Sequence, residues 1–174
     1  MADAGLRSAL MALHVAIQTE KDGRDFYKRA AEKSSDPGGK LLFASLADDE
    51  LEHLRLLESQ REALAREGKW LSPEKPDGQT PPIKVEGAPL FSREAVTSNV
   101  NAYTSDLSAL RLAFLIEKDA VVFYTRAAAE TEDPDGKAMY GRLVEMEKEH
   151  RRILEEEYNA LAKEFWSTMG FEPF

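Results

Sequence analysis

The stretches LADDELEHL at residues 46–54 and LVEMEKEHR at residues 143–151 decide the fold of this chain. Each contains the pattern Glu-x-x-His, at residues 50–53 and 147–150. Two residues that are three positions apart on an α-helix share one face, so the carboxylate and the imidazole can bind one metal ion together. One copy of this pattern means little in a chain rich in glutamate, but two copies call for an explanation.

The two stretches belong to a longer repeat. When Glu20 is aligned with Glu117, at an offset of 97 residues (117 − 20 = 97), the two Glu-x-x-His patterns coincide without a gap. The segments 20–57 and 117–154 are then identical at 18 of 38 positions, and each pattern follows its aligned glutamate by 30 residues (50 − 20 = 30 and 147 − 117 = 30). A duplication explains this, and it predicts two copies of one structural unit.

Each copy is predicted to form a helical hairpin, over about residues 3–66 and about residues 105–166. Apolar residues recur in both copies at the three- and four-residue steps of one helical face. The positions expected on the inner faces are Leu6, Leu10, Leu13, Ile17, Phe43, Leu46, Leu57, Leu64, Leu107, Leu110, Ala113, Leu143, Leu154 and Leu161.

The helix ends have their own signals. The pair Asp-Pro at 36–37 and again at 133–134 suits an N-cap followed by proline in the first turn, so the second helix of each hairpin should begin there. We expect the first helix to end near Ser34, the second near Arg66, and the third to begin near Ser105.

Residues 67–104, between the hairpins, contain five of the eight prolines and cannot form a long helix, although residues 92–96 could form one helical turn. A linker this long is explained if it crosses the whole length of a bundle, about 40 Å at 1.5 Å per residue. We therefore expect one domain over residues 1–174, with a crossover between the hairpins. The alternative is a linker that carries the second hairpin onto another chain.

Composition limits the function classes. The chain has 174 residues, 43% of them hydrophobic and 32% charged, which is typical of a folded globular protein. A net charge of −9 argues against binding to nucleic acid or to anionic membranes. The absence of cysteine excludes disulfides, iron–sulfur clusters and cysteine-based zinc sites, and it agrees with the cytoplasmic location that we expect.

Four glutamates continue the apolar stripes of the four predicted helices. They are Glu20, Glu50, Glu117 and Glu147. Charged residues are almost never buried unless they are paired or bound to metal, and four carboxylates in one core would repel one another. Two divalent cations would balance their charge. The alternative is that the helical phase is misjudged by one residue and that the glutamates are solvated.

One glutamate from each of two helices and one Glu-x-x-His from each of two others is the ligand set of carboxylate-bridged di-metal bundles. In these motifs the chain resembles the ferritin-like superfamily, and most of all its rubrerythrin branch. The resemblance covers both hairpins and not the linker. It implies an all-α, antiparallel four-helix bundle that holds two metal ions per chain, with iron expected first and manganese or zinc as alternatives.

The resemblance also implies a role for each ligand. The first glutamate of each copy would bind one metal, the glutamates of the two Glu-x-x-His patterns would bridge both metals, and each histidine would complete one metal. The implied ligands are Glu20, Glu50, His53, Glu117, Glu147 and His150.

Three further residues are candidates for supporting the ligands. Tyr27 and Tyr124 lie two turns after the first glutamate of each copy, where tyrosines of rubrerythrins hydrogen-bond to ligand carboxylates; they could equally be ordinary core tyrosines. Asp49 could accept the second ring N–H of His150, or it could be a solvated acid. Met146 occupies the equivalent place in the second copy and cannot accept a hydrogen bond in this way.

The chain departs from the rubrerythrin pattern in two ways. It has no cysteine for a rubredoxin domain, so a redox-active form would need another protein as its electron donor. Peroxide-reducing rubrerythrins use an extra glutamate three residues after the first glutamate of the third helix. Here Ala120 occupies that position, and its repeat mate is Gly23.

The resemblance favours a di-iron protein with oxidoreductase activity toward peroxide or dioxygen. Two alternatives remain open: an iron-binding or storage protein with ferroxidase-type uptake, and a non-catalytic bundle whose metals are structural. A homodimer is expected from the resemblance and from an apolar C-terminal segment with Phe165, Trp166, Phe171 and Phe174. The sequence does not decide whether the second hairpin is swapped between chains.

Overall fold

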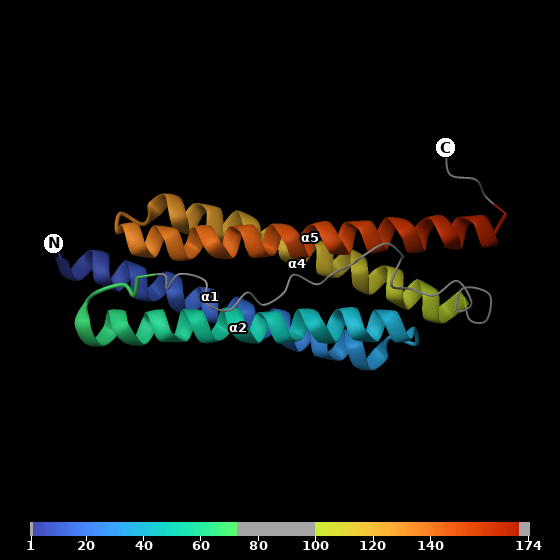
Figure 1. Cartoon of the computed structure of the whole chain (residues 1–174), viewed down its shortest axis with the longest axis horizontal. Coiled ribbons are helices and arrows are strands. Elements are labelled where there is room, and N and C mark those ends of the chain that lie inside the picture. Colours follow the sequence, from blue (N-terminus) through green and yellow to red (C-terminus); the bar gives the residue numbers. More distant parts are fainter. Residues whose placement is uncertain (1, 73–99, 171–174) are drawn as a thin grey trace.

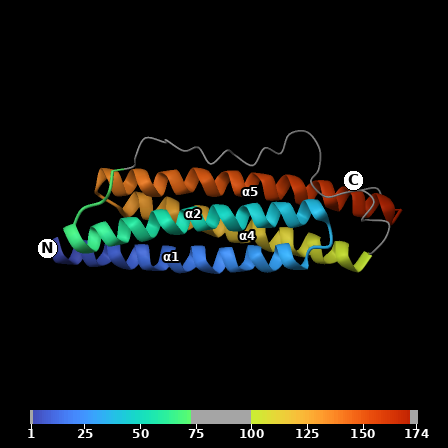
Figure 2. The same cartoon turned by 60° about the horizontal axis from the view of Figure 1, so that its bottom comes forward.

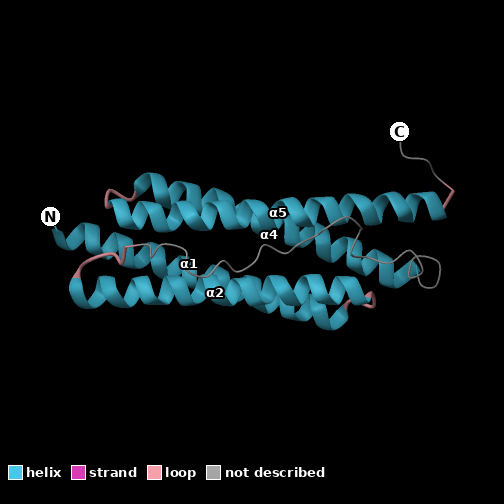
Figure 3. Ribbon diagram, viewed as in Figure 1, coloured by secondary structure: helices cyan, strands magenta, loops and turns pink. Residues whose placement is uncertain are grey.

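The computed structural model describes residues 2–72 and 100–170, and over these ranges it consists of four helices without a strand (Figures 1 and 3). The helices are α1 (Ala2–Lys33), α2 (Pro37–Glu67), α4 (Val100–Glu130) and α5 (Pro134–Thr168). Helix α1 packs along α2, helix α4 packs along α5, and α1 also contacts α4. The predicted all-α bundle of two hairpins is confirmed.

The helices lie side by side and alternate in direction. The colours of Figures 1 and 2 show that α1 and α5 run one way and that α2 and α4 run the other way. Helix α2 therefore ends at the end of the bundle opposite to the one where α4 begins. The predicted crossover lies for the most part outside the described residues. The predicted turn at residues 92–96 lies outside the described residues.

Helices α2 and α5 begin where the sequence predicts. The Oδ1 atom of Asp36 accepts hydrogen bonds from two backbone N–H groups of the first turn of α2, at 2.8 and 3.0 Å. Asp133 does the same for α5, at 2.9 and 3.2 Å. In both helices the next residue is proline, whose missing N–H is not needed in the first turn.

Helix α4 begins earlier than predicted. It begins at Val100, so Ser105 lies inside the helix and does not cap it. The neighbouring Asp106 is buried and hydrogen-bonds to Ser34 at the end of the first hairpin's α1. A cap preference is a local signal, and tertiary packing of this kind overrides it.

The apolar core forms two clusters with a polar layer between them. The first cluster contains buried residues from 42–47 of α2 and from 153–161 of α5. The second cluster contains buried residues from 54–64 of α2 and from 139–144 of α5. The residues left between the clusters are those of the two Glu-x-x-His patterns. Among the described helices, none has the length and apolar character needed to cross a bilayer.

Candidate metal centre

The polar layer in the middle of the bundle collects six acidic and imidazole side chains from all four helices. They are Glu20 of α1, Glu50 and His53 of α2, Glu117 of α4, and Glu147 and His150 of α5. None of the six is more than 5% exposed. The alternative interpretation of solvated glutamates is therefore wrong. Their burial follows from helical phase, because each glutamate continues a stripe whose apolar members are themselves buried.

The six residues form two overlapping groups of possible metal ligands. One group contains Glu20 and His53, the other contains Glu117 and His150, and both contain Glu50 and Glu147. Within each group, one ligand atom per residue lies within 4.8 Å of the others. Two shared carboxylates between two four-residue groups are the arrangement in which two metals can be bridged.

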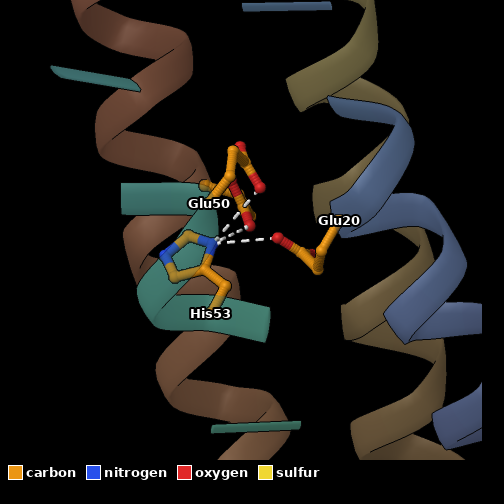
Figure 4. A group of neighbouring side chains, drawn as sticks. Glu20, Glu50 and His53 are labelled. Carbon is orange, nitrogen blue, oxygen red and sulfur yellow. Dashed lines mark hydrogen bonds and ion pairs between the residues drawn. The ribbon is translucent and has the colours of Figure 1, made fainter. Parts of the chain in front are cut away.

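The contacts around the first histidine are close. His53 Nδ1 lies 3.2 Å from Glu20 Oε2, 3.7 Å from Glu50 Oε2 and 3.1 Å from Glu147 Oε1. Figure 4 shows Glu20 extending from α1 toward Glu50 and His53 on α2. Three carboxylates from three helices therefore converge on one ring nitrogen.

The second histidine repeats this geometry. His150 Nδ1 lies 3.3 Å from Glu147 Oε2 and 3.7 Å from Glu117 Oε1. The rings of His53 and His150 are stacked, with centroids 5.5 Å apart and planes inclined by 21°. Both imidazoles thus present Nδ1 to the carboxylates and keep Nε2 on the far side.

The two tyrosines bind the glutamates crosswise. The Tyr27 hydroxyl on α1 donates a hydrogen bond to Glu117 Oε1 on α4, and the Tyr124 hydroxyl on α4 donates to Glu20 Oε1 on α1. Each tyrosine therefore orients the glutamate of the other hairpin, and the two bonds join α1 to α4. Sequence spacing places a tyrosine and its glutamate on one face, but it does not reveal this exchange.

The far nitrogens of the two histidines differ. His150 Nε2 lies 3.3 Å from Asp49 Oδ2. His53 Nε2 is buried and has no hydrogen-bond partner among the described residues. This difference follows from the repeat, because Met146 stands where a second Asp49 would be. The two halves of the site are therefore chemically unequal.

Burial and crowding keep protons on part of the cluster. Burial raises the pKa of Glu50 well above its usual range, and the carboxylates of Glu20 and Glu147 raise it further. Burial together with Glu147 does the same to the pKa of Glu117. The cluster cannot hold all its carboxylates ionised without added positive charge.

The imidazoles supply some of that charge. Burial lowers their pKa, but the facing carboxylates outweigh it: the pKa of His53 lies well above its usual range, and Asp49 and Glu147 raise the pKa of His150 to about 9. Burial would raise the pKa of Glu147, but the charge of His53 and contacts with both histidines hold it well below its usual range.

The chemistry of these donors fits two divalent metals. Both Glu147 oxygens and His150 Nδ1 are buried, and none has a partner with hydrogen-bond geometry in the described part of the chain. Metal ions would use these atoms and would replace the protons, because imidazole and carboxylate bind metal in their deprotonated forms. A set of carboxylates and imidazoles suits iron, manganese or zinc.

Sequence analysis missed one residue near the site. Tyr140 is buried and stacks on Tyr124, with ring centroids 6.1 Å apart. Its repeat mate Phe43 stacks in the same way on Tyr27, at 6.4 Å. The signal was an aromatic residue at this position of both copies (140 − 43 = 97).

One comparison with known proteins gives a match. A family model described as Rubrerythrin matches residues 12–158, which include all six residues of the site. No match was found among curated proteins, and none among solved structures.

Proposed function

This chain belongs to the rubrerythrin family, and we propose that it is a di-iron protein that reduces peroxide or dioxygen. The observation that carries the proposal is the pair of overlapping four-residue groups that share Glu50 and Glu147. A site for a single metal would not need two complete groups, and a purely structural cluster would not need four buried acids.

Each residue would have a defined part in holding the metals. Glu20 and His53 would bind one iron, Glu117 and His150 would bind the other, and the two shared glutamates would bridge them. When bound, the irons would supply electrons by cycling between ferrous and ferric states. An external protein would restore those electrons, because the chain has no cysteine for a rubredoxin-type donor.

The chain's own residues would prepare the site for this chemistry. The hydrogen bonds from Tyr27 to Glu117 and from Tyr124 to Glu20 hold these two glutamates in position and place phenolic protons beside them. The two apolar clusters on either side exclude bulk water, which strengthens the electrostatic interactions inside.

Iron uptake with ferroxidase activity is the second candidate. The observation in its favour is Ala120, a buried alanine at the place where peroxide-reducing rubrerythrins have a further glutamate. A site without that carboxylate is less specialised for peroxide.

The test is a single-turnover reaction. We would load the protein anaerobically with Fe(II), add peroxide or dioxygen, and follow oxidation by stopped-flow optical spectroscopy. Fast oxidation of two irons per chain is the expected result. Growth of a large ferric core would favour storage, and an inert protein would leave only a structural metal site. Glu147→Gln should impair the reaction. Glu145→Gln makes the same neutral replacement at an exposed position of the same helix and should not impair it.

The proposal includes a homodimer in the cytoplasm. Trp166 and Met169 are 46% and 49% exposed at the end of α5, and Phe165 is partly buried beside them. Phe171 and Phe174 lie outside the described residues. Light scattering should give about twice the chain mass of 19.5 kDa. A mass equal to one chain would contradict the dimer, with or without hairpin exchange.

A further inference from the structure

A row of aromatic rings leads from the metal centre toward the surface. The Tyr124 hydroxyl donates to Glu20, and the Tyr124 ring stacks on Tyr140 with centroids 6.1 Å apart and planes inclined by 26°. Tyr140 in turn meets Trp70 edge to face, with centroids 5.8 Å apart. Both tyrosines are buried, whereas Trp70 is partly exposed. Adjacent rings therefore connect the centre to solvent.

Contacts on two sides hold Trp70 in this row. Its indole lies directly on Gly136 of α5, where an added Cβ would come within 2.6 and 2.7 Å of two ring carbons. The side-chain amide of Gln60 bonds to both the N–H and the C=O of Leu71, at 2.9 and 3.0 Å. The Gln60 bonds thus fix the chain after α2 to α2 itself. The Trp70 ring lies against the second hairpin, where Gly136 makes room for the indole.

In the part of the chain that the structure describes, the aromatic contacts of the other half are different. Tyr27, which binds Glu117, stacks on Phe43. Phenylalanine occupies the place of Tyr140, and the position equivalent to Trp70 at the repeat offset is Ser167 (70 + 97 = 167), which has no ring. Only tyrosine and tryptophan among aromatic side chains lose and regain single electrons readily. The row that contains Trp70 is therefore the redox-competent one.

We propose that Trp70, Tyr140 and Tyr124 form a path by which single electrons enter the metal centre from an external one-electron reductant. The centre's need for electrons rests on the proposed function, but the path itself consists of this chain's own side chains. The reductant would dock at the end of the bundle where α2 ends and α5 begins, beside the half-exposed Leu71 (Figure 1).

The electrons and protons balance at each step. Tyrosine loses an electron only to a strong oxidant, so the path would operate while peroxide at the centre supplies the oxidising equivalents. Tyr124 would then give one electron to the centre and its phenolic proton to Glu20, along the hydrogen bond between them. Trp70 then gives an electron to Tyr124, and the proton returns from Glu20. Trp70 releases its indole proton to solvent, and the reductant restores both electron and proton. Two such transfers, with two protons from solvent, reduce one organic hydroperoxide to an alcohol and water, or one hydrogen peroxide to two waters.

Tyr140 serves this path through its ring alone. Its hydroxyl is buried and has no partner in the described part of the chain, so nothing there accepts its proton. Loss of an electron without loss of the proton is costly in an apolar environment. The electron therefore passes through the stacked ring from Trp70 to Tyr124, and Tyr140→Phe should preserve the transfer.

The test needs no iron, which separates it from the proposed function. Azide radicals from pulse radiolysis oxidise tryptophan, and Trp166→Phe leaves Trp70 as the single tryptophan of the full-length chain. We expect the Trp70 radical to convert to a tyrosyl radical, which is the transfer between Trp70 and Tyr124 run in the reverse direction along the same path, at a rate independent of protein concentration. Tyr124→Phe should abolish this conversion. Tyr158→Phe, at a partly buried tyrosine that the path does not use, should leave its rate as it was.

Gly136→Ala supplies a second variant, because it displaces the indole and leaves every ring of the path in the chain. It should slow the conversion, with the helical content checked by circular dichroism. A Trp70 radical that decays only by reaction between molecules would overturn the path, as would a conversion indifferent to Tyr124→Phe. Intact conversion in a protein whose Fe(II) form is inert to peroxide would instead overturn the proposed function.

Discussion

Glu20 and Glu117 occupy helix positions at which the surrounding pattern would place leucine or isoleucine, yet they are only 2% and 1% exposed. An ionised carboxylate in such a place is costly unless a cation or a proton offsets its charge. In the metal-free protein, burial raises the pKa of Glu117 so that it keeps a proton, and the charged imidazoles of His53 and His150 offset further negative charge. Metals would offset this charge in the loaded protein, so the state of these residues should control affinity and stability.

The Asp49 carboxylate should strengthen metal binding on the His150 side. It orients the imidazole and makes the ring a better donor, and loss of such a partner typically weakens metal affinity by roughly 10–100-fold. We expect that effect from Asp49→Asn in a chelator-competition titration. Asp48→Asn is the control. Asp48 is the exposed neighbour of Asp49, and its replacement removes the same charge from a residue that does not contact His150. Equal affinities for the two variants would contradict this role.

The metal-free protein should lose stability as the pH rises. The His150 pKa of about 9 lies above its usual 6.5, so the stability contributed by its charged form is complete below pH 6.5 and is lost as the pH rises through 9. The raised pKa values of Glu50 and Glu117 act in the same direction. The low pKa of Glu147 has the opposite effect: it makes stability fall as the pH is lowered, but only below pH 4.5, the usual pKa of a glutamate.

Urea denaturation with a chelator present measures this pH effect. From His150 alone, the free energy of unfolding should fall by on the order of 3 kcal/mol between pH 6.5 and pH 9. The metal-loaded protein should show no such fall, because metals compete with protons for the same atoms. A metal-free protein whose stability is constant or rises over this range would refute the proton balance described above.

At the scale of the helices, the repeat explains both what could be predicted and what could not. The Asp-Pro pairs marked the starts of α2 and α5 because they supply a cap and a compatible first residue. The start of α4 could not be read in this way, because Asp106 packs against the first hairpin and no local signal records that contact. The helical periodicity of the sequence correctly predicted that the six site residues lie on the inner faces of the helices.

Periodicity did not find the neighbours of those faces. The crossed bonds of Tyr27 and Tyr124 depend on how α1 lies against α4, which spacing along the chain does not determine. The row from Tyr124 to Trp70 depends on where the chain turns after α2. Such contacts between elements are set by packing, and a single sequence carries no direct record of them.

Helix α4 also carries the position that should limit peroxide turnover. Ala120 is 5% exposed and lies one turn beyond Glu117. A Cβ at its repeat mate Gly23 would lie 3.7 Å from the Glu50 carboxyl group, so this level of the bundle borders the shared carboxylates. We expect slow peroxide turnover by the unmodified chain and faster turnover by Ala120→Glu.

Ala120→Gln is the control for that variant, because it has the same size without the charge. Either replacement overfills the core and should cost roughly 1–3 kcal/mol of stability, which thermal unfolding measures. The two variants differ only in the charge of the new side chain, so a difference in peroxide consumption between their folded, metal-loaded forms reports the effect of that charge. Equal rates for Ala120→Glu and Ala120→Gln would show that the missing carboxylate is not the limit, and fast turnover by the unmodified chain would show it more directly.

At the scale of the whole molecule, the site divides the core. One apolar cluster lies on each side of the six residues, and every helix contributes to the polar layer between them. Metal binding should therefore stabilise the entire bundle. Two-state linkage gives about 2.7 kcal/mol when free metal is 100 times its dissociation constant. A chelator should lower the midpoint of thermal unfolding at neutral pH, and an unchanged midpoint would argue against a buried metal.

The most direct test of the central claim, that these six residues hold two metals, is anomalous diffraction at the iron edge from crystals of the Fe(II)-loaded protein. We predict two peaks about 3.5–4 Å apart, as in other two-metal sites. One should lie among Glu20, Glu50, His53 and Glu147, and the other among Glu50, Glu117, Glu147 and His150. A single peak, or no peak between the four helices, would contradict the claim.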